Sequence, residues 1–207
     1  MPWLMSAIYD RFMRASEDAC LGQWRQTLLA PLTGDVLEVG AGTGINLPFY
    51  PPAVTRLVLT EPDPPMAKQL AARLQAAPRP GVELAHADVQ ALPFADGSFD
   101  SVVATLLLCS VPQPEQALAE IQRVLRPGGV FVFLEHVAAP PGTSRRAWQG
   151  RVEPMWKYVA GNCHVTRETR AAIAASGLVL GEVDEASMRR ALPILRPTVR
   201  GVAYKPG

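Results

Sequence analysis

Cysteine is scarce in this chain, and charge of neither sign dominates it. The 207 residues contain three cysteines, which are far apart and include no Cys-x-x-Cys pair. Such a set is too small for a disulfide scaffold and has the wrong spacing for a zinc site. The 20 Lys and Arg residues against 19 Asp and Glu residues leave a net charge of +1. This balance gives no electrostatic reason to expect nucleic acid or an anionic membrane as the main partner.

Long hydrophobic runs and a secretory signal are also missing. The longest uncharged apolar stretch, Ser101 to Val111, is well short of the ~20 residues that span a bilayer. Met1 to Tyr9 lacks the basic segment that begins a secretory signal, and Asp10 follows at once. We therefore expect a cytoplasmic protein without a transmembrane segment. Apolar residues make up 48% of the chain, which is ample for a packed core.

What the sequence does contain is an alternation of short apolar runs and helical patterns. The runs are rich in Val, Leu and Phe, as strands buried on both faces are. They are Asp35–Val39, Arg56–Thr60, Val82–Ala85, Phe99–Leu108 and Val130–Leu134. Helical patterns lie between them at Met66–Ala76 and Glu115–Leu125, and Arg126–Gly129 turns the chain into the next strand. This repetition predicts a mainly parallel sheet with helices on both faces.

The C-terminal part predicts two more strands. They are Leu178–Val183 and Thr198–Tyr204, and they follow a helix at about Arg167–Ala175 with Thr166 as its N-cap. Because their connection is short for a helical crossover, we expect these two strands to pair antiparallel at one sheet edge. Trp3–Leu29 is typical of two amphipathic helices. The predicted fold class is α/β, a doubly wound and mostly parallel seven-stranded sheet whose last strand is antiparallel.

A glycine-rich turn follows the first predicted strand. Gly40, Gly42 and Gly44 alternate with other residues directly after that strand. Glycine lets the backbone turn sharply and approach a ligand closely, and ligands bind at the carboxyl ends of parallel strands. A tight turn without a ligand fits the same residues. A dinucleotide fingerprint would need glycine where Ile45 stands, so pyrophosphate recognition is disfavoured.

Acidic residues end the next two strands. Glu61 stands about twenty residues after Gly40, where a carboxylate can accept hydrogen bonds from both hydroxyls of a ribose. A lone Glu at a strand end is otherwise usually just solvated. Asp88 ends the third strand and could accept a hydrogen bond from an exocyclic amine, while Val89 offers an apolar surface. The spacing of these residues from the glycine turn favours a nucleoside site.

In this order the features resemble the class I S-adenosylmethionine-dependent methyltransferases, over about residues 30–135. Three further segments are similar to the methyltransferase type 11 domain group: Leu92-Pro93-Phe94, Gly97-Ser98-Phe99-Asp100 and Val124-Leu125-Arg126-Pro127-Gly128-Gly129. The resemblance implies S-adenosyl-L-methionine as the cofactor and a single Rossmann-like domain. Residues 1–30 would form lid helices, 31–136 the cofactor-binding core, and 137–207 the substrate-side helices and last two strands.

The resemblance also implies which positions bind the cofactor. These are Tyr9, Glu38, Gly40, Ala41, Gly42, Asn46, Glu61, Asp88, Val89, Thr105 and Leu106. The glycine turn would lie against the methionine part, Glu61 would hold the ribose, and Asp88 would meet the adenine. Thr105 would contact the methionine end. Tyr9 would sit on a lid helix that closes the pocket, although a plain core aromatic fits that position equally well.

A second resemblance extends over nearly the whole chain, from about Tyr9 to Tyr204. The segments that carry it are Asn46–Pro51, Thr105–Val111, Phe133–Ala139, Trp148-Gln149, Pro154–Trp156 and Gly161–Glu168. They closely resemble the thiol S-methyltransferase subgroup, whose animal members are membrane-anchored. This sequence departs from the subgroup at its front, where no long hydrophobic anchor precedes the catalytic domain. The implied acceptor is a small, fairly apolar thiol or hydrosulfide.

Thiols need little help to accept a methyl group. A free thiol has a pKa near ~8.5, so a minor fraction is already a nucleophilic thiolate at neutral pH. His136, after the fifth strand, and His164 are the candidate catalytic residues, because an imidazole can receive a proton near pH 7. A plain structural role is the alternative for both. Cys109 and Cys163 are interpreted as packing residues, since direct transfer needs no enzyme thiol.

Other functions fit the same sequence. The fold could methylate a lipid amine, a quinone carbon or a phenol, and His136 would then be essential as a base. A non-catalytic module could bind S-adenosylmethionine and regulate a partner through the apolar segment Leu192–Leu195. A nicotinamide oxidoreductase is disfavoured by Ile45. We expect a small-molecule acceptor, no nucleic acid, no metal, and a monomer or small homo-oligomer.

Overall fold

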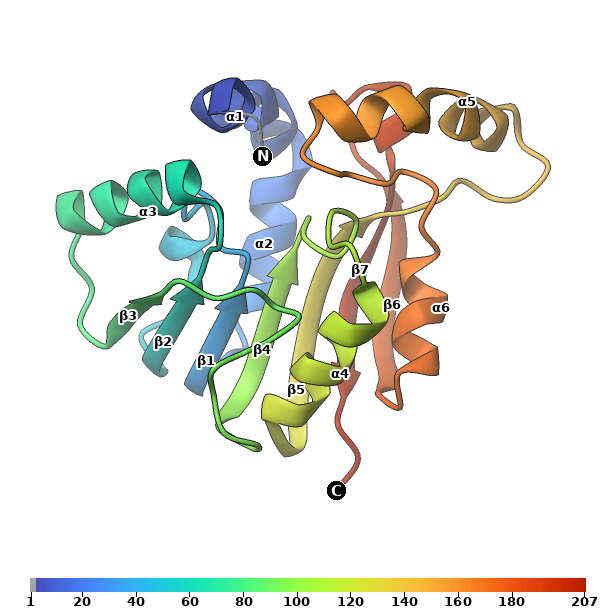
Figure 1. Ribbon diagram of the computed structural model, residues 1–207. Helices are drawn as coiled ribbons and strands as arrows, with labels where there is room; N and C mark the ends of the chain where they lie inside the picture. The colour runs from blue at the N-terminus through green and yellow to red at the C-terminus, as the bar shows by residue number, and fades with distance from the viewer. Residues whose placement is uncertain (1–2) are drawn as a thin grey trace.

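A seven-stranded sheet forms the centre of the computed structural model, which describes residues 3–207 and the side chains from Tyr9 onward (Figure 1). The strands lie in the order β3-β2-β1-β4-β5-β7-β6. Their bounds are β1 Gly34–Val39, β2 Val54–Thr60, β3 Val82–Ala85, β4 Phe99–Thr105, β5 Leu125–His136, β6 Val179–Ser187 and β7 Pro197–Tyr204. Strands β1 to β5 pair in parallel, and β7 is antiparallel to both β5 and β6. The predicted fold class is confirmed.

Helices lie on the faces of this sheet and beyond the carboxyl ends of its strands (Figure 1). They are α1 Trp3–Ser16, α2 Gly22–Leu29, α3 Pro64–Ala76, α4 Pro114–Val124, α5 Ser144–Val159 and α6 Thr169–Ala175. A π-helical turn, Glu17–Leu21, joins α1 to α2, so the two predicted N-terminal helices are present. Proline in the first turn of α3 and α4 costs no intrahelical hydrogen bond. Asp63 caps α3 by accepting from the Met66 N–H at 3.2 Å.

Two apolar clusters hold the layers together. On one face Leu118 and Ile121 of α4 and Ile173 of α6 pack with Phe131 and Phe133 of β5. On the other face α2 and α3 contribute further leucines against β1 and β2. Because these strands are buried on both faces, their sequences are continuously apolar.

Several predicted boundaries differ from the structure, among them the end of β6, which is Ser187 rather than Val183. β4 ends at Thr105 rather than Leu108, because Leu106 adopts the left-handed conformation with φ +56° and turns the chain away from the sheet. α6 begins at Thr169, two residues later than predicted. Its N-cap is Glu168 rather than Thr166, whose N–H donates to Glu153 on α5 at 2.8 Å. The Arg126–Gly129 turn lies within the bounds of β5 as an irregularity in its pairing with β4.

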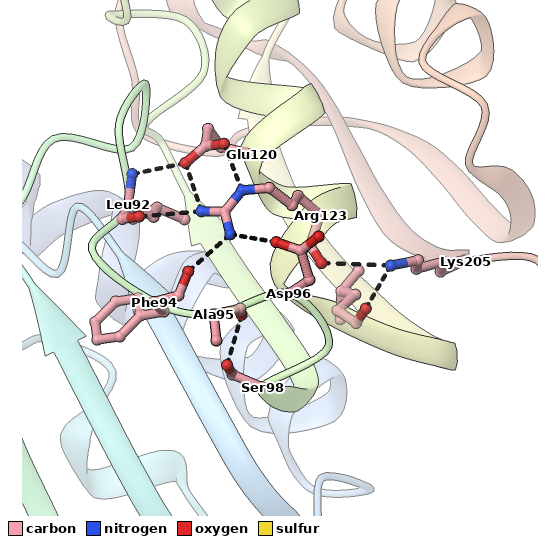
Figure 2. A network of polar contacts seen from close by, with 9 residues as sticks. Leu92, Phe94, Ala95, Asp96, Ser98, Glu120, Arg123 and Lys205 are labelled. Carbon is pink, nitrogen blue, oxygen red and sulfur yellow. Dashed lines mark hydrogen bonds and ion pairs between the residues drawn. The ribbon is translucent and has the colours of Figure 1, made fainter.

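Arg123 explains the presence of the segment Leu92-Pro93-Phe94, which precedes β4. Its guanidinium donates to the carbonyls of Leu92 and Phe94, and to the carboxylates of Asp96 and Glu120, at 2.7–3.0 Å (Figure 2). Glu120 also accepts from the Leu92 N–H at 2.8 Å. These contacts fix the loop between β3 and β4 to α4, so this motif stabilises the core rather than binding a ligand.

None of the helices in residues 3–207 has the length and apolar character that crossing a membrane requires. The Leu192–Leu195 segment is only partly a surface patch, because Leu192 is exposed while Leu195 is buried in the turn Pro193–Leu195.

Candidate functional site

A cavity of about 230 Å³ lies where β1, β2 and β4 end, with α1 above the same edge of the sheet (Figure 1). It is the expected place for a ligand in an open parallel sheet. Nine of the predicted cofactor-binding residues line it: Tyr9, Gly40, Ala41, Gly42, Glu61, Asp88, Val89, Thr105 and Leu106. The structure therefore brings together segments that are up to about 100 residues apart in the chain.

The glycine turn requires glycine for two different reasons. Gly40 and Gly42 have φ of +63° and +59°, which side chains rarely tolerate. A Cβ at Gly40 would lie 2.5 Å from the Leu107 side chain, whereas no atom lies within 4 Å of a Cβ placed at Gly42. Gly40 thus permits close packing inside the protein, and Gly42 leaves backbone open toward the cavity.

Glu61 holds this turn and faces the cavity. Its carboxylate accepts from the Gly42 N–H at 2.8 Å and from the Asp63 N–H at 2.9 Å. Burial raises the pKa of Glu61, while these two N–H groups act in the opposite direction. A carboxylate offers about four acceptor positions, so two remain for a ligand.

Asp88 and Val89 form a contrasting pair on the cavity wall. Val89 is buried and apolar, whereas Asp88 is exposed and accepts from the Gln90 N–H at 2.9 Å. An apolar surface beside a carboxylate can receive a flat ring that carries a hydrogen-bond donor.

Glu38 and Asn46 lie beneath the cavity and are not among the residues that line it. The buried Glu38 carboxylate accepts from the Asn46 amide at 2.8 Å and from the Tyr50 hydroxyl at 2.7 Å. Burial raises the pKa of Glu38 to about 7. These two residues brace the segment after the glycine turn from behind.

Arg25 is a lining residue that sequence reasoning missed. It reaches the cavity from α2 with its side chain 2% exposed, and it donates to Asn46 Oδ1 at 2.7 Å and Thr105 Oγ1 at 2.8 Å. Glu17 balances its charge through an ion pair of 3.0 Å. The only signal in the sequence is a cation on a helix that packs against the core.

Glu135 is a second residue without a predicted role. Its buried carboxylate accepts from the N–H groups of Leu107, Leu108 and Cys109 at 2.9–3.2 Å. Burial raises the pKa of Glu135 to about 7. It thereby fixes the turn after β4 that places Thr105 and Leu106 at the cavity.

The N-terminal helix is tied across the opening. Tyr9 lines the cavity, and burial raises the pKa of its phenol. The adjacent Asp10 accepts from the Thr43 hydroxyl at 2.7 Å and pairs with Arg73 of α3 at 2.6 Å. These contacts join α1 to the glycine turn and to α3.

The two candidate catalytic histidines do not line this cavity. His136 is buried, its Nδ1 has no hydrogen-bond partner among the described residues, and burial lowers its pKa to about 4. His164 is engaged through Nδ1 with Glu153 at 3.0 Å and through Nε2 with Asn162 at 3.2 Å. His164 thereby joins Glu153 of α5 to Asn162 in the loop after that helix.

The chain is similar to known methyltransferases. A family model described as a methyltransferase domain matches residues 37–133. The chain is 37% identical to the Homo sapiens thiol S-methyltransferase TMT1B, covering 99% of this chain and 85% of that protein. It is also 37% identical to Homo sapiens TMT1A, covering 82% and 70%. The N-methyltransferase NodS of Bradyrhizobium japonicum, in complex with S-adenosyl-L-homocysteine, matches with a TM-score of 0.69 and 18% identity, over 93% of this chain and 88% of that one.

The fold is Rossmann-like, and its cavity lies at the carboxyl edge of the sheet, where folds of this class bind nucleoside cofactors. The chain belongs to the methyltransferase domain family and is an S-adenosylmethionine-dependent methyltransferase.

The residues present fit S-adenosyl-L-methionine. Gly42 leaves backbone room at the turn, Glu61 retains acceptor positions, and Val89 with Asp88 can take an amino-substituted ring.

Proposed function

We propose that this methyltransferase acts on a small, fairly apolar thiol or hydrosulfide. Support comes from the relatives named above, which are thiol S-methyltransferases at 37% identity over most of this chain. We also propose that Glu61 holds the ribose hydroxyls, that Asp88 and Val89 receive the adenine, and that the glycine turn, Thr105 and Leu106 contact the methionine part.

The protein's own residues would bind, orient and shield the reactants. When bound, the cofactor supplies a methyl group on a positively charged sulfur. Glu135 and Gly40 fix the turns on either side of the cavity, so the backbone there is in place before a ligand arrives. Tyr9 lines the cavity and Asp10 ties α1 to the glycine turn, so α1 would shield part of the opening from water.

The observation that carries this proposal is the chemistry of the cavity wall near the turn after β4. Among the described lining residues, this part consists of Leu106, Leu107, Ser110, Val111 and Pro112, without histidine or carboxylate. A phenol or carbon acceptor usually needs a positioned base, whereas about 3% of a thiol with a pKa of ~8.5 is thiolate at pH 7. Alignment alone can then supply much of the acceleration.

A methyl-transfer panel tests the proposal. Purified protein is incubated with S-adenosyl-L-methionine and a small alkyl thiol, hydrosulfide, a phenol or a lipid amine, and release of S-adenosyl-L-homocysteine is measured. We expect turnover with the thiols, with kcat/KM rising about tenfold per pH unit below the thiol pKa. Turnover only with the phenol or the amine would contradict the proposal.

The His136→Gln variant serves as the matched comparison. Because His136 does not line the cavity, its thiol turnover should remain within about threefold of the unmodified protein at pH 7.5. A loss of 100-fold or more with unchanged folding would mean that His136 acts as a base.

A further inference from the structure

Most of the large apolar side chains that the described residues expose gather at one end of the molecule. Six of these nine residues lie on α1, on α5 or directly before the turn Pro193–Leu195. They are Phe12, Trp148, Met155, Tyr158, Val159 and Leu192, and they are 45–77% exposed. Figure 1 shows α1 and α5 at the same end, beyond the carboxyl ends of the strands. Single exposed apolar residues are ordinary, whereas a gathering of this kind marks an interaction site.

These side chains form one continuous surface. Trp148, Met155 and Tyr158 follow one another along α5 at spacings of seven and three residues, which place them on one face of the helix. Leu192 lines two neighbouring grooves of about 220 and 540 Å³. It shares the first groove with Phe12 of α1 and the second with Trp148 of α5. The surface therefore runs from α1 across Leu192 and along α5.

Three arginines within this surface have no acidic partner. Arg190 and Arg145 each line one of the two grooves, and Arg151 lies between Trp148 and Met155 on the same face of α5. All three are exposed, and none takes part in an ion pair among the described residues. The net charge of +1 for the whole chain therefore conceals a basic end.

We propose that this basic-apolar surface binds a membrane that contains anionic lipid. It consists of Phe12, Trp148, Met155, Tyr158, Val159 and Leu192 with Arg145, Arg151 and Arg190. Tryptophan and tyrosine rings lie at the level of the lipid headgroups, and aliphatic side chains reach the acyl boundary just below. Arginine pairs with lipid phosphates and is attracted by the charge of anionic lipid. The protein would lie on the membrane with α5 along the interface.

A second copy of this chain fits the surface less well. In a symmetric dimer the same patch faces itself, so the three arginines would face three arginines. The acid on α5 is Glu153, which is already engaged with His164 Nδ1 at 3.0 Å and with the Thr166 N–H at 2.8 Å. No acid stands in residues 188–196. A membrane with anionic lipid supplies the negative charge that a second copy lacks here.

Vesicle binding tests the proposal. The full chain is mixed with vesicles of phosphatidylcholine alone, or with about 30% phosphatidylserine, and the bound fraction is measured by flotation. We expect binding to the anionic vesicles that weakens at high salt, and much weaker binding to phosphatidylcholine alone. Arg151→Gln should lower the partition coefficient about fivefold, and Arg145→Gln with Arg151→Gln about 25-fold. Trp148→Ser with Met155→Ser should lower it at least about tenfold.

Matched controls lie outside the surface. Arg56→Gln removes the same charge from an exposed ion pair near the amino end of β2, and Val179→Ser removes an apolar side chain as exposed as Trp148. Both should bind the vesicles within about twofold of the unmodified protein, because the effect of a charge is confined to about a Debye length. No residue of the surface lines the cavity, so every variant should keep its affinity for S-adenosyl-L-homocysteine, which verifies its folding.

Three results would overturn the proposal. They are the absence of binding to anionic vesicles at low salt, equal losses for surface and control variants, and a dimer that Trp148→Ser with Met155→Ser converts to a monomer. The dimer, measured by light scattering, would assign the surface to a second copy. None of these measurements involves a methyl acceptor, so the result is independent of which acceptor the enzyme uses.

Discussion

The role of Glu61 can be tested by changing one atom of its side chain. In Glu61→Gln, one oxygen becomes an NH₂ group, which must face the N–H of either Gly42 or Asp63. The variant therefore loses an acceptor and the negative charge at a position that is 8% exposed. A hydrogen bond to a charged group contributes about 1.5–3 kcal/mol, so S-adenosyl-L-homocysteine should bind roughly 10- to 150-fold more weakly.

Calorimetry with a second ligand identifies which part of the cofactor Glu61 holds. If it holds the ribose, removing a ribose hydroxyl should cost the unmodified protein about 1.5 kcal/mol or more, and the Glu61→Gln variant almost nothing. Glu83→Gln is the control, because Glu83 is exposed on β3, pairs with Arg56, and does not line the cavity. Equal losses for the deoxy ligand in both proteins would refute the assignment.

Three further predictions concern residues around the cavity and below it. Asp10→Asn removes the charge that pairs with Arg73, so S-adenosyl-L-homocysteine should bind about threefold more weakly at low salt and lose less affinity at high salt. Calorimetry measures this affinity, which the exposed Asp18→Asn control should leave unchanged. Arg123→Met should lower the free energy of unfolding in urea by about 2–3 kcal/mol, against less than about 1 kcal/mol for Arg170→Gln at the surface. His136 should make stability pH-dependent: its folded pKa of about 4 lies below the usual 6.5, so its contribution is complete above pH 6.5 and is lost as the pH falls toward 4.

The lowered pKa of His136 sets how much stability is lost at acid pH. Between pH 7.5 and pH 5 these two pKa values correspond to about 2 kcal/mol of lost stability from His136. Glu38 and Glu135 have folded pKa values raised to about 7, so they favour the folded state as the pH falls over the same range. The measurement is therefore the difference between His136→Gln and the unmodified protein in urea titrations at both pH values. Parallel pH profiles for the two proteins would show that His136 has the same pKa in the folded and unfolded states.

Local patterns were sufficient to predict the sheet, because each buried strand has its own apolar run and its own turn. They also located the glycine turn and Glu61, since both follow directly from the ends of β1 and β2. The end of β4 was predicted at Leu108 instead of Thr105, because Leu106 and Leu107 continue the apolar run although they do not belong to the strand. Leu107 packs against Gly40, and Leu106 turns with φ +56°.

Local sequence patterns could not identify Arg25 and Glu135 as residues of the site. Arg25 contacts Thr105, 80 residues further on, and Glu135 accepts from Leu107, 28 residues before it. Such contacts depend on the completed fold, and no local spacing records them. His136 shows the converse limit: it ends a strand at the correct edge of the sheet, but successive strand residues point to opposite sides. Glu135 has the position that reaches the turn after β4.

The two sides of the cavity are held in place by different parts of the fold, and only one of these parts can move independently of the sheet. Glu38, Glu61 and Glu135 each stand on a sheet strand or at its end, and each accepts from a segment at or beneath the cavity. The cofactor half is therefore braced by buried groups within the sheet. The opposite side depends on α1, through the part-exposed Asp10, and on the loop after α5, which holds Cys163. Because those segments can shift without breaking the sheet, acceptor choice is expected to depend on them, whereas most of the expected cofactor contacts come from the strand ends.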